Sequence, residues 1–176
     1  MIIAFHLLLG WLIADFISGI LHWLEDRVLW VGMPVISKSV VEPNRLHHIR
    51  PAAFLEQGFL TRNSTGWVVA LQLSFLWIAL IGFSFVWLGA TLGGLVATEV
   101  HARAHRKQGG TFIGVLQDIG IIQSTYHHGQ HHRGDFDRRY CVLTGWLNPV
   151  IDWIGLWAGL EKFLTIIGLK PNRGTK

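Results

Sequence analysis

The stretch GWVVALQLSFLWIALIGFSFVWLGATLGGLVA, residues 66–97, decides the fold, because none of its 32 residues is charged. A hydrocarbon core needs about 20 apolar residues for one helical crossing. The stretch therefore forms either one tilted span or a hairpin of two spans that turns near Gly82-Phe83-Ser84.

The residues on either side of this stretch favour the hairpin. His47 and His48 precede it, and His101 and His105 follow it. One crossing would put the two pairs on opposite sides of the membrane, whereas a hairpin returns the chain to the side that it left. All 15 Lys and Arg residues lie at Arg27 or beyond, outside the apolar stretches. With the amino terminus outside, a hairpin puts all of them on the cytoplasmic side, as the positive-inside rule prefers.

The hairpin predicts spans at about 66–81 and 84–98. Each arm has about 15 residues, or roughly 23 Å at 1.5 Å per residue, so we expect some thinning of the bilayer. Another apolar stretch, about 2–23, is long enough for a third span. It lacks the basic start and small-residue cleavage site of a signal peptide, and we therefore expect a retained anchor.

The first span carries polar residues on one side. Asp15, Ser18, His22 and Asp26 recur at helical spacing and so share a face. Ionisable groups inside a membrane are costly and commonly functional. This face should point into the protein.

The rest of the chain predicts a cap of short helices. Residues 31–65 are rich in turn formers and indicate a loop with short helices, and 111–126 indicates a helix. Residues 146–168 are apolar but interrupted by polar side chains, which favours an in-plane amphipathic helix over a fourth span. The predicted fold is a single domain, residues 1–176: an all-α, multi-pass integral membrane protein with three transmembrane helices, a cytoplasmic-side histidine-rich helical cap and an in-plane helix.

The composition agrees with a membrane protein. Apolar residues make up 51% of the 176, and charged residues 15%, against roughly 25% in globular proteins. The net charge of +4 is spread along the chain without interleaved aromatic residues, which favours an anionic membrane surface over nucleic acid as the partner. The single Cys141 excludes an intramolecular disulfide, and by itself it holds neither an iron–sulfur cluster nor a thiolate zinc site.

Histidine is the unusual residue, because eight of the ten lie in three tight groups. His101 and His105 lie one helical turn apart, and His128, His131 and His132 follow helical spacing, so each set can reach one metal ion. Single pairs are as easily explained by packing or exposure. Four imidazoles within residues 127–132 are not, because they repel when protonated and are poorly solvated when neutral.

The number of histidines indicates two metal ions. With His22, His47 and His48 included, at least eight imidazoles are available, and one ion takes three or four protein ligands. Imidazole binds zinc, copper, nickel and iron, so the residue types do not choose the metal. His6 lies toward the opposite membrane face and is not expected to be a ligand.

Four motifs resemble those of the Kua or CarF lipid desaturase family, which includes plasmanylethanolamine desaturase and the plastid phosphatidylglycerol palmitate desaturase. They are DFISGILHWLED (15–26), LHHIRP (46–51), EVHARAH (99–105), and HHGQHH (127–132) continued by YCVLTGWLNP (140–149). The resemblance implies an O2-dependent oxidoreductase with two iron ions that desaturates an alkyl or acyl chain of a phospholipid. It also implies an external electron donor of the cytochrome b5 or ferredoxin type.

The resemblance also implies roles for individual residues. The expected iron ligands are His22, His47, His48, His101, His105, His127 or His128, His131 and His132. Asp15, Asp26 and Asp118 are candidates for orienting these imidazoles, with capping or packing as the alternative. Arg45, Arg50 and Arg133 are candidates for a phosphate headgroup, with a general attraction to anionic lipid as the alternative.

The lipid chain is expected in an apolar cleft between the three spans, with Trp23, Trp67 and Trp146 near its mouth. Two other functions fit the same residues. One is a hydroxylase with the same metal site. The other is a metal transporter or metal-binding membrane protein, which residues 66–97 disfavour because they contain no ionisable group.

Overall fold

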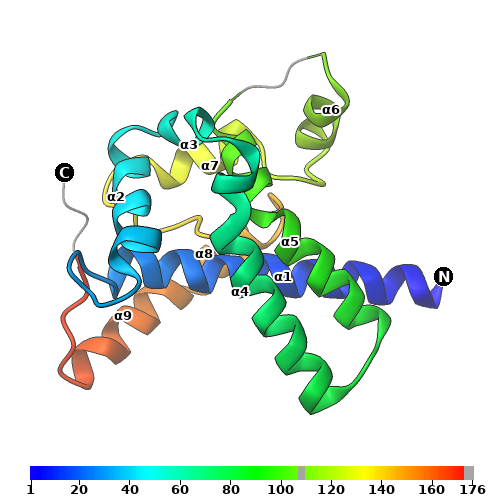
Figure 1. Ribbon diagram of the computed structural model, residues 1–176, viewed down its shortest axis with the longest axis horizontal. Helices are drawn as coiled ribbons and strands as arrows, with labels where there is room; N and C mark the ends of the chain where they lie inside the picture. Colours follow the sequence, from blue (N-terminus) through cyan, green and yellow to red (C-terminus); the bar gives the residue numbers. More distant parts are fainter. Residues whose placement is uncertain (107–109, 173–176) are drawn as a thin grey trace.

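The computed structural model describes residues 1–106 and 110–172, and within them it contains helices and no strand. Three helices are long and apolar enough to cross a membrane: α1 (Ile2–Arg27), α4 (Phe59–Ile81) and α5 (Phe85–Ala104) (Figure 1). The turn between α4 and α5 lies at the predicted residues 82–84. The predicted all-α membrane fold, with one span and a hairpin, is confirmed.

Both arms of the hairpin are longer than predicted. The helices have 23 and 20 residues, or roughly 34 and 30 Å, and the added segments, 59–65 and 99–104, carry Arg62, Glu99 and Arg103. The apolar length, on which the expected thinning of the bilayer depends, is therefore unchanged. In these added segments, Arg62 on α4 pairs with Glu99 on α5 at 2.8 Å, so the two helices remain in contact there.

Small residues bring α1 and α5 close together. A Cβ on Gly10 or Gly89 would overlap the backbone of the other helix, and a Cβ on Gly93 would overlap Ala14. Small residues at four-residue spacing are a common helix–helix contact in membranes. At these contacts, the residue numbers increase in the same direction along both helices, so α1 and α5 run parallel. In contrast, Asn63 is the only buried residue of α4, which packs mainly on α5.

A strap, residues 140–144, runs along the polar face of α1. The side chains of Asp15, Ser18 and His22 each hydrogen-bond the backbone of this strap. The strap leads into a core cluster in which Trp23 of α1 packs with Tyr140. The polar face of α1 therefore points into the protein, as predicted.

Short helices complete the structure around this framework. The predicted loop with short helices at 31–65 is confirmed by η1 (Ser37–Val41), α2 (Glu42–Ile49) and α3 (Ala53–Glu56), after which α4 begins. In Figure 1, α2, α3 and α7 gather on one side of α1, and α9 lies on the other.

Two helices predicted as continuous are each interrupted. Residues 111–126 contain α6 (Phe112–Asp118) and the start of α7 (Thr125–His131), separated by a turn at Gly120 with φ +76°. The predicted in-plane helix at 146–168 is two helices, α8 (Leu147–Trp153) and α9 (Leu156–Ile166), separated at Gly155 with φ +67°. Glycine adopts this left-handed backbone without steric cost, and both glycines end a helix here.

Candidate metal centre

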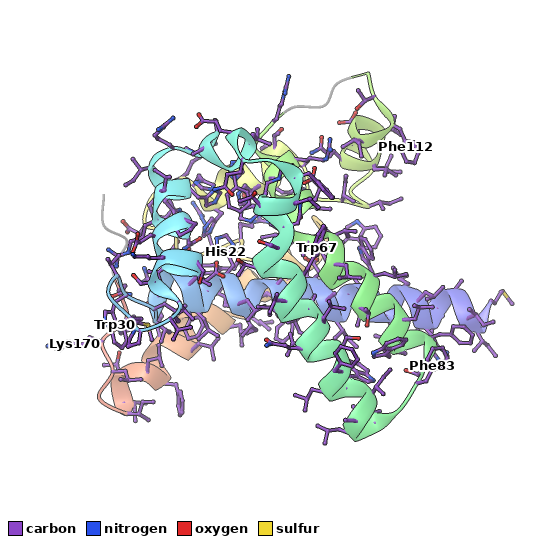
Figure 2. All side chains as sticks on the ribbon, in the orientation of Figure 1. His22, Trp30, Trp67, Phe83, Phe112 and Lys170 are labelled. Atoms are coloured by element: carbon purple, nitrogen blue, oxygen red, sulfur yellow. The ribbon has the colours of Figure 1, made fainter. Side chains whose placement is uncertain are left out.

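Four parts of the fold bring eight histidines together. His22 lies on α1, and Figure 2 shows it in the interior of the molecule, whereas Phe83 lies at the outer end of the hairpin. The histidines fall into two groups, in each of which potential ligand atoms lie within 4.8 Å of one another. The five-histidine group contains His47, His101, His105, His128 and His132; the histidine–aspartate group contains His22, Asp26, His48 and His131.

The five-histidine group is centred on Nε2 of His128. This atom lies 3.0 Å from Nε2 of His101, 2.9 Å from that of His105 and 3.0 Å from that of His132. One ring nitrogen carries either one proton or one lone pair, so these three contacts cannot all be hydrogen bonds. Nitrogens that share one ion at 2.0–2.1 Å lie roughly 3.0–3.4 Å apart. The arrangement therefore fits a metal ion.

His47 gives an independent sign of a missing partner, because both of its ring nitrogens are buried without a hydrogen bond. A buried polar atom without a partner is costly, and a metal ion would satisfy one of the two nitrogens. Burial, followed by the neighbouring histidines, lowers the pKa of His47 and His128 well below the ordinary value. The same causes lower the pKa of His105 to about 4 and that of His132 to about 2. At neutral pH these imidazoles are uncharged, as metal ligands must be.

The histidine–aspartate group is built around a carboxylate. Asp26 lies 2.7 Å from Nε2 of His48, 3.2 Å from that of His131 and 3.8 Å from that of His22. Asn44 donates a hydrogen bond to the same carboxylate at 2.6 Å. We expected Asp26 to orient an imidazole from outside, but it lies inside the group as a potential ligand. The sequence contains a signal for this, because His22 and Asp26 have the same four-residue spacing as His101 and His105.

Two backbone carbonyls orient this second group. Nδ1 of His22 lies 3.1 Å from the carbonyl oxygen of Tyr140, and Nδ1 of His131 lies 2.7 Å from that of Arg138. An Nδ1–H that donates to a carbonyl leaves the lone pair on Nε2, which faces the group. Arg139, next in the chain, has a φ of +61°, an uncommon conformation for a non-glycine residue. Sequence reasoning missed these carbonyls, because a backbone acceptor has no residue signature.

Three predicted site residues lie elsewhere. The His127 ring lies outside both groups, where a Cβ on Gly145 would lie 3.1 Å from it, so His128 is the member of this pair that joins a group. Asp15 accepts hydrogen bonds from the Leu143 amide and the Thr144 hydroxyl, so it holds the strap in place, which is the packing alternative, and hydrogen-bonds no imidazole in the described part of the chain.

Asp118 is exposed at the end of α6, and it hydrogen-bonds no histidine within the residues described. The arrangement gives it no part in orienting an imidazole.

A cavity of about 390 Å³ lies between the three spans, where we expected an apolar cleft. His22 from the histidine–aspartate group and His101 from the five-histidine group both line it. Its far part, along α4 and α5, is lined mainly by apolar side chains and extends to Trp77 and Trp87. One space therefore reaches both histidine groups.

The predicted tryptophans and arginines do not line this cavity. Trp23 is in the core instead, and Trp67 and Trp146 are not among the lining residues.

Of the arginines, Arg50 pairs with Glu56 at 3.0 Å on the surface, and Arg45 is also absent from the lining. Arg133 lines a separate cavity together with three aspartates. The cavity between the spans therefore gives no support to the predicted contact of these three arginines with a phosphate headgroup.

The fold and the site define a multi-span helical membrane protein with a buried polyhistidine cluster. The family model of the lipid desaturase domain matches residues 11–174, and the chain belongs to this family. It is 28% identical to the plasmanylethanolamine desaturase of Myxococcus xanthus over 94% of this chain and 62% of that protein. It is 32% identical to plasmanylethanolamine desaturase 1 of Mus musculus (93% and 65%) and 28% identical to the chloroplastic fatty acid desaturase 4 of Arabidopsis thaliana (93% and 52%).

The chain thus spans a little under two thirds of the length of the first two relatives. No solved structure matches it.

Proposed function

We propose that the chain is a membrane-bound, O2-dependent di-iron desaturase that introduces a double bond into an alkyl or acyl chain carried by a phospholipid. The observation that carries this proposal is the cavity, because it is apolar along the spans and reaches one histidine from each group, His22 and His101. The names of the relatives, which are desaturases of ether lipids and of fatty acids, support the same chemistry.

The two histidine groups would each hold one iron ion. Imidazole and carboxylate are suitable ligands for iron, although the same atoms bind other divalent metals. When bound, the irons supply with dioxygen the oxidising power to remove hydrogen from an unactivated methylene, which side-chain acid–base chemistry lacks. The alternative, a hydroxylase, would use the same ligands.

Residues of the chain position the substrate and keep the imidazoles uncharged and oriented for metal binding. Burial keeps His47 and His128 uncharged, and the carbonyls of Arg138 and Tyr140 hold two further imidazoles in place. Helix α5 lines the cavity from Trp87 to His101, a length of about 14 residues or roughly 21 Å. A hydrocarbon chain fits along this length.

The polar lining residues support an orientation of the lipid. Asn44, Gln57 and Arg62 lie at the histidine end of the cavity, and the tryptophans lie at the other end. A lipid with its headgroup at the polar end would present carbons close to the headgroup to the histidines. The proposed double bond therefore forms in the head-proximal part of the chain.

The proposal includes a membrane side and a partner. The positive-inside rule puts the histidine groups on the cytoplasmic side. The proposed partner is an external electron donor of the cytochrome b5 or ferredoxin type, and residues 1–176 contain no cysteine cluster, haem motif or flavin motif.

Expression in a host without this activity tests the proposal. Mass spectrometry of the lipids should show a loss of two hydrogens with the wild type and with His127→Ala, whose ring lies outside both groups, and no change with His131→Ala. A gain of one oxygen would indicate the hydroxylase. The same new unsaturation with His131→Ala as with the wild type would reject the proposal.

A further inference from the structure

One face of the short helix α6 packs against the membrane spans. Ile113 and Leu116 contact a core cluster that contains Ala14, near the middle of α1, and Val100 of α5. Val100 closely follows the uncharged stretch 66–97, so α6 lies beside the spans where their apolar part ends. Figure 1 shows α6 apart from α2, α3 and α7, on the side of the molecule that is nearer to the amino terminus.

The opposite face of α6 is exposed and apolar. Phe112 is 75% exposed, Val115 is 54% exposed, and Ile119, directly after the helix, is 58% exposed. These positions are three and four residues apart and therefore share one side of the helix. Figure 2 shows Phe112 at the outer surface, away from the interior of the molecule. Asp118, exposed at the edge of this face, is the one charged side chain in residues 110–126.

The surroundings of α6 indicate that lipid covers this face. An exposed apolar patch that continues the surface of membrane spans is an unfavourable contact with water and a favourable one with acyl chains. Trp146 is 43% exposed beside the end of α6, where a Cβ on Gly120 would lie 3.0 Å from its Nε1. Exposed tryptophan is enriched at the depth of the lipid headgroups, so the same end of α6 lies at the membrane surface.

We propose that α6 is an interfacial helix that lies in the bilayer leaflet on the histidine side, with Phe112, Val115 and Ile119 among the acyl chains and Asp118 at the headgroups. Its partner is the lipid surface itself. The proposal adds a membrane-inserted element to the three spans, and it places that element outside residues 146–168, where the sequence indicates an in-plane helix. It does not depend on the proposed reaction.

The insertion of α6 would also set the depth of the histidines on α7. The two helices are joined by residues 119–124, and this link is held by Gln123. The Gln123 amide donates to the Leu143 carbonyl at 2.8 Å, and its side chain donates to the Cys141 carbonyl at 2.6 Å. A helix anchored in the leaflet therefore holds the start of α7 close to the membrane surface.

Spin labels on single cysteines test the inference on the full chain in phospholipid vesicles. Val115→Cys and Ile119→Cys carry the label on the exposed apolar face, and Asp118→Cys is the matched control at its edge. The native Cys141 is buried and should take no label, which labelling of the wild type checks. Collisions with oxygen, which concentrates among the acyl chains, are compared with collisions with a polar nickel chelate, which stays in water.

We expect the ratio of oxygen to nickel collisions to be several times higher at Val115→Cys and Ile119→Cys than at Asp118→Cys. Phe75→Cys, at a position 71% exposed on α4, is the reference for lipid, and Glu56→Cys, on the surface, is the reference for water. All these side chains are exposed, so the variants should unfold at the temperature of the wild type.

Two outcomes would overturn the inference. A ratio at Val115→Cys and Ile119→Cys equal to that at Glu56→Cys would place α6 in water. Poor access of both reagents to these two labels would show that protein, such as a second copy of the chain, covers the helix instead of lipid.

Discussion

The two histidine groups differ in how the protein holds them. In the histidine–aspartate group, the carbonyls of Tyr140 and Arg138 orient His22 and His131, and a carboxylate lies among the rings. In the five-histidine group, the Nδ1 atoms of His47, His128 and His132 are buried without a partner, as is that of His48 in the other group. The first group therefore combines a carboxylate with imidazoles oriented by the backbone, whereas the second consists of imidazoles alone. Two metal ions bound as proposed would be chemically different.

The largest effect is expected where the five-histidine group is centred. His128→Ala removes the nitrogen that contacts three others, so it should lower bound iron from about two ions per chain to about one and reduce desaturation by more than about 100-fold. Metal analysis and lipid mass spectrometry measure both effects. His127→Ala is the matched control, with two irons and full activity. Two irons in His128→Ala would contradict the assignment.

Asp26→Asn tests the other group while keeping the side-chain shape. Removing the carboxylate charge should weaken iron binding at the histidine–aspartate group by about 10- to 100-fold and leave the five-histidine group occupied. A metal titration with two resolved steps measures this. Equal weakening of both steps would show that the groups are not independent.

Removal of the metal should destabilise the folded protein. An ion at a concentration about 100 times its dissociation constant adds roughly 2.7 kcal/mol, so chelation of two such ions should lower the unfolding temperature by roughly 10–20 °C. The unfolding temperature of His128→Ala should fall about half as far on chelation as that of the wild type, since the variant starts with one ion. An unfolding temperature that does not respond to chelation would mean that no metal is bound to the folded state.

The smallest effect is expected at the strap. Ser18→Ala removes the hydrogen bond from the Val142 amide, 3.1 Å long, which should cost about 1 kcal/mol and lower the unfolding temperature by roughly 2–4 °C. The strap also carries the carbonyl that orients His22, so iron binding should weaken slightly at the histidine–aspartate group alone. Thermal unfolding and the two-step metal titration separate these effects. Weaker binding at the five-histidine group would contradict them.

The sequence predicts the parts of this structure that depend on local pattern. The uncharged stretch 66–97 predicts the hairpin, and helical spacing predicts the inward face of α1 and the histidines that come together. It does not predict the lengths of the helices, because the spans are predicted from apolar residues and both helices continue into segments that carry charges, 59–65 and 99–104. Nor does it predict the breaks at Gly120 and Gly155, because the sequence does not distinguish a glycine that adopts a positive φ from any other glycine.

The division of the histidines into two groups also required the structure. It depends on how α1, α2, α5 and α7 pack, which periodicity does not show. For the same reason, the sequence did not show that Asp26 lies inside one of the groups as a potential ligand.

The most direct test is a Mössbauer spectrum of the protein loaded with isotopically enriched iron. Two different ligand sets should give two signals of equal area, and Asp26→Asn should change one of them and leave the other intact. A single signal, or an Asp26→Asn spectrum identical to that of the wild type, would contradict a pair of unlike iron sites built from these histidines.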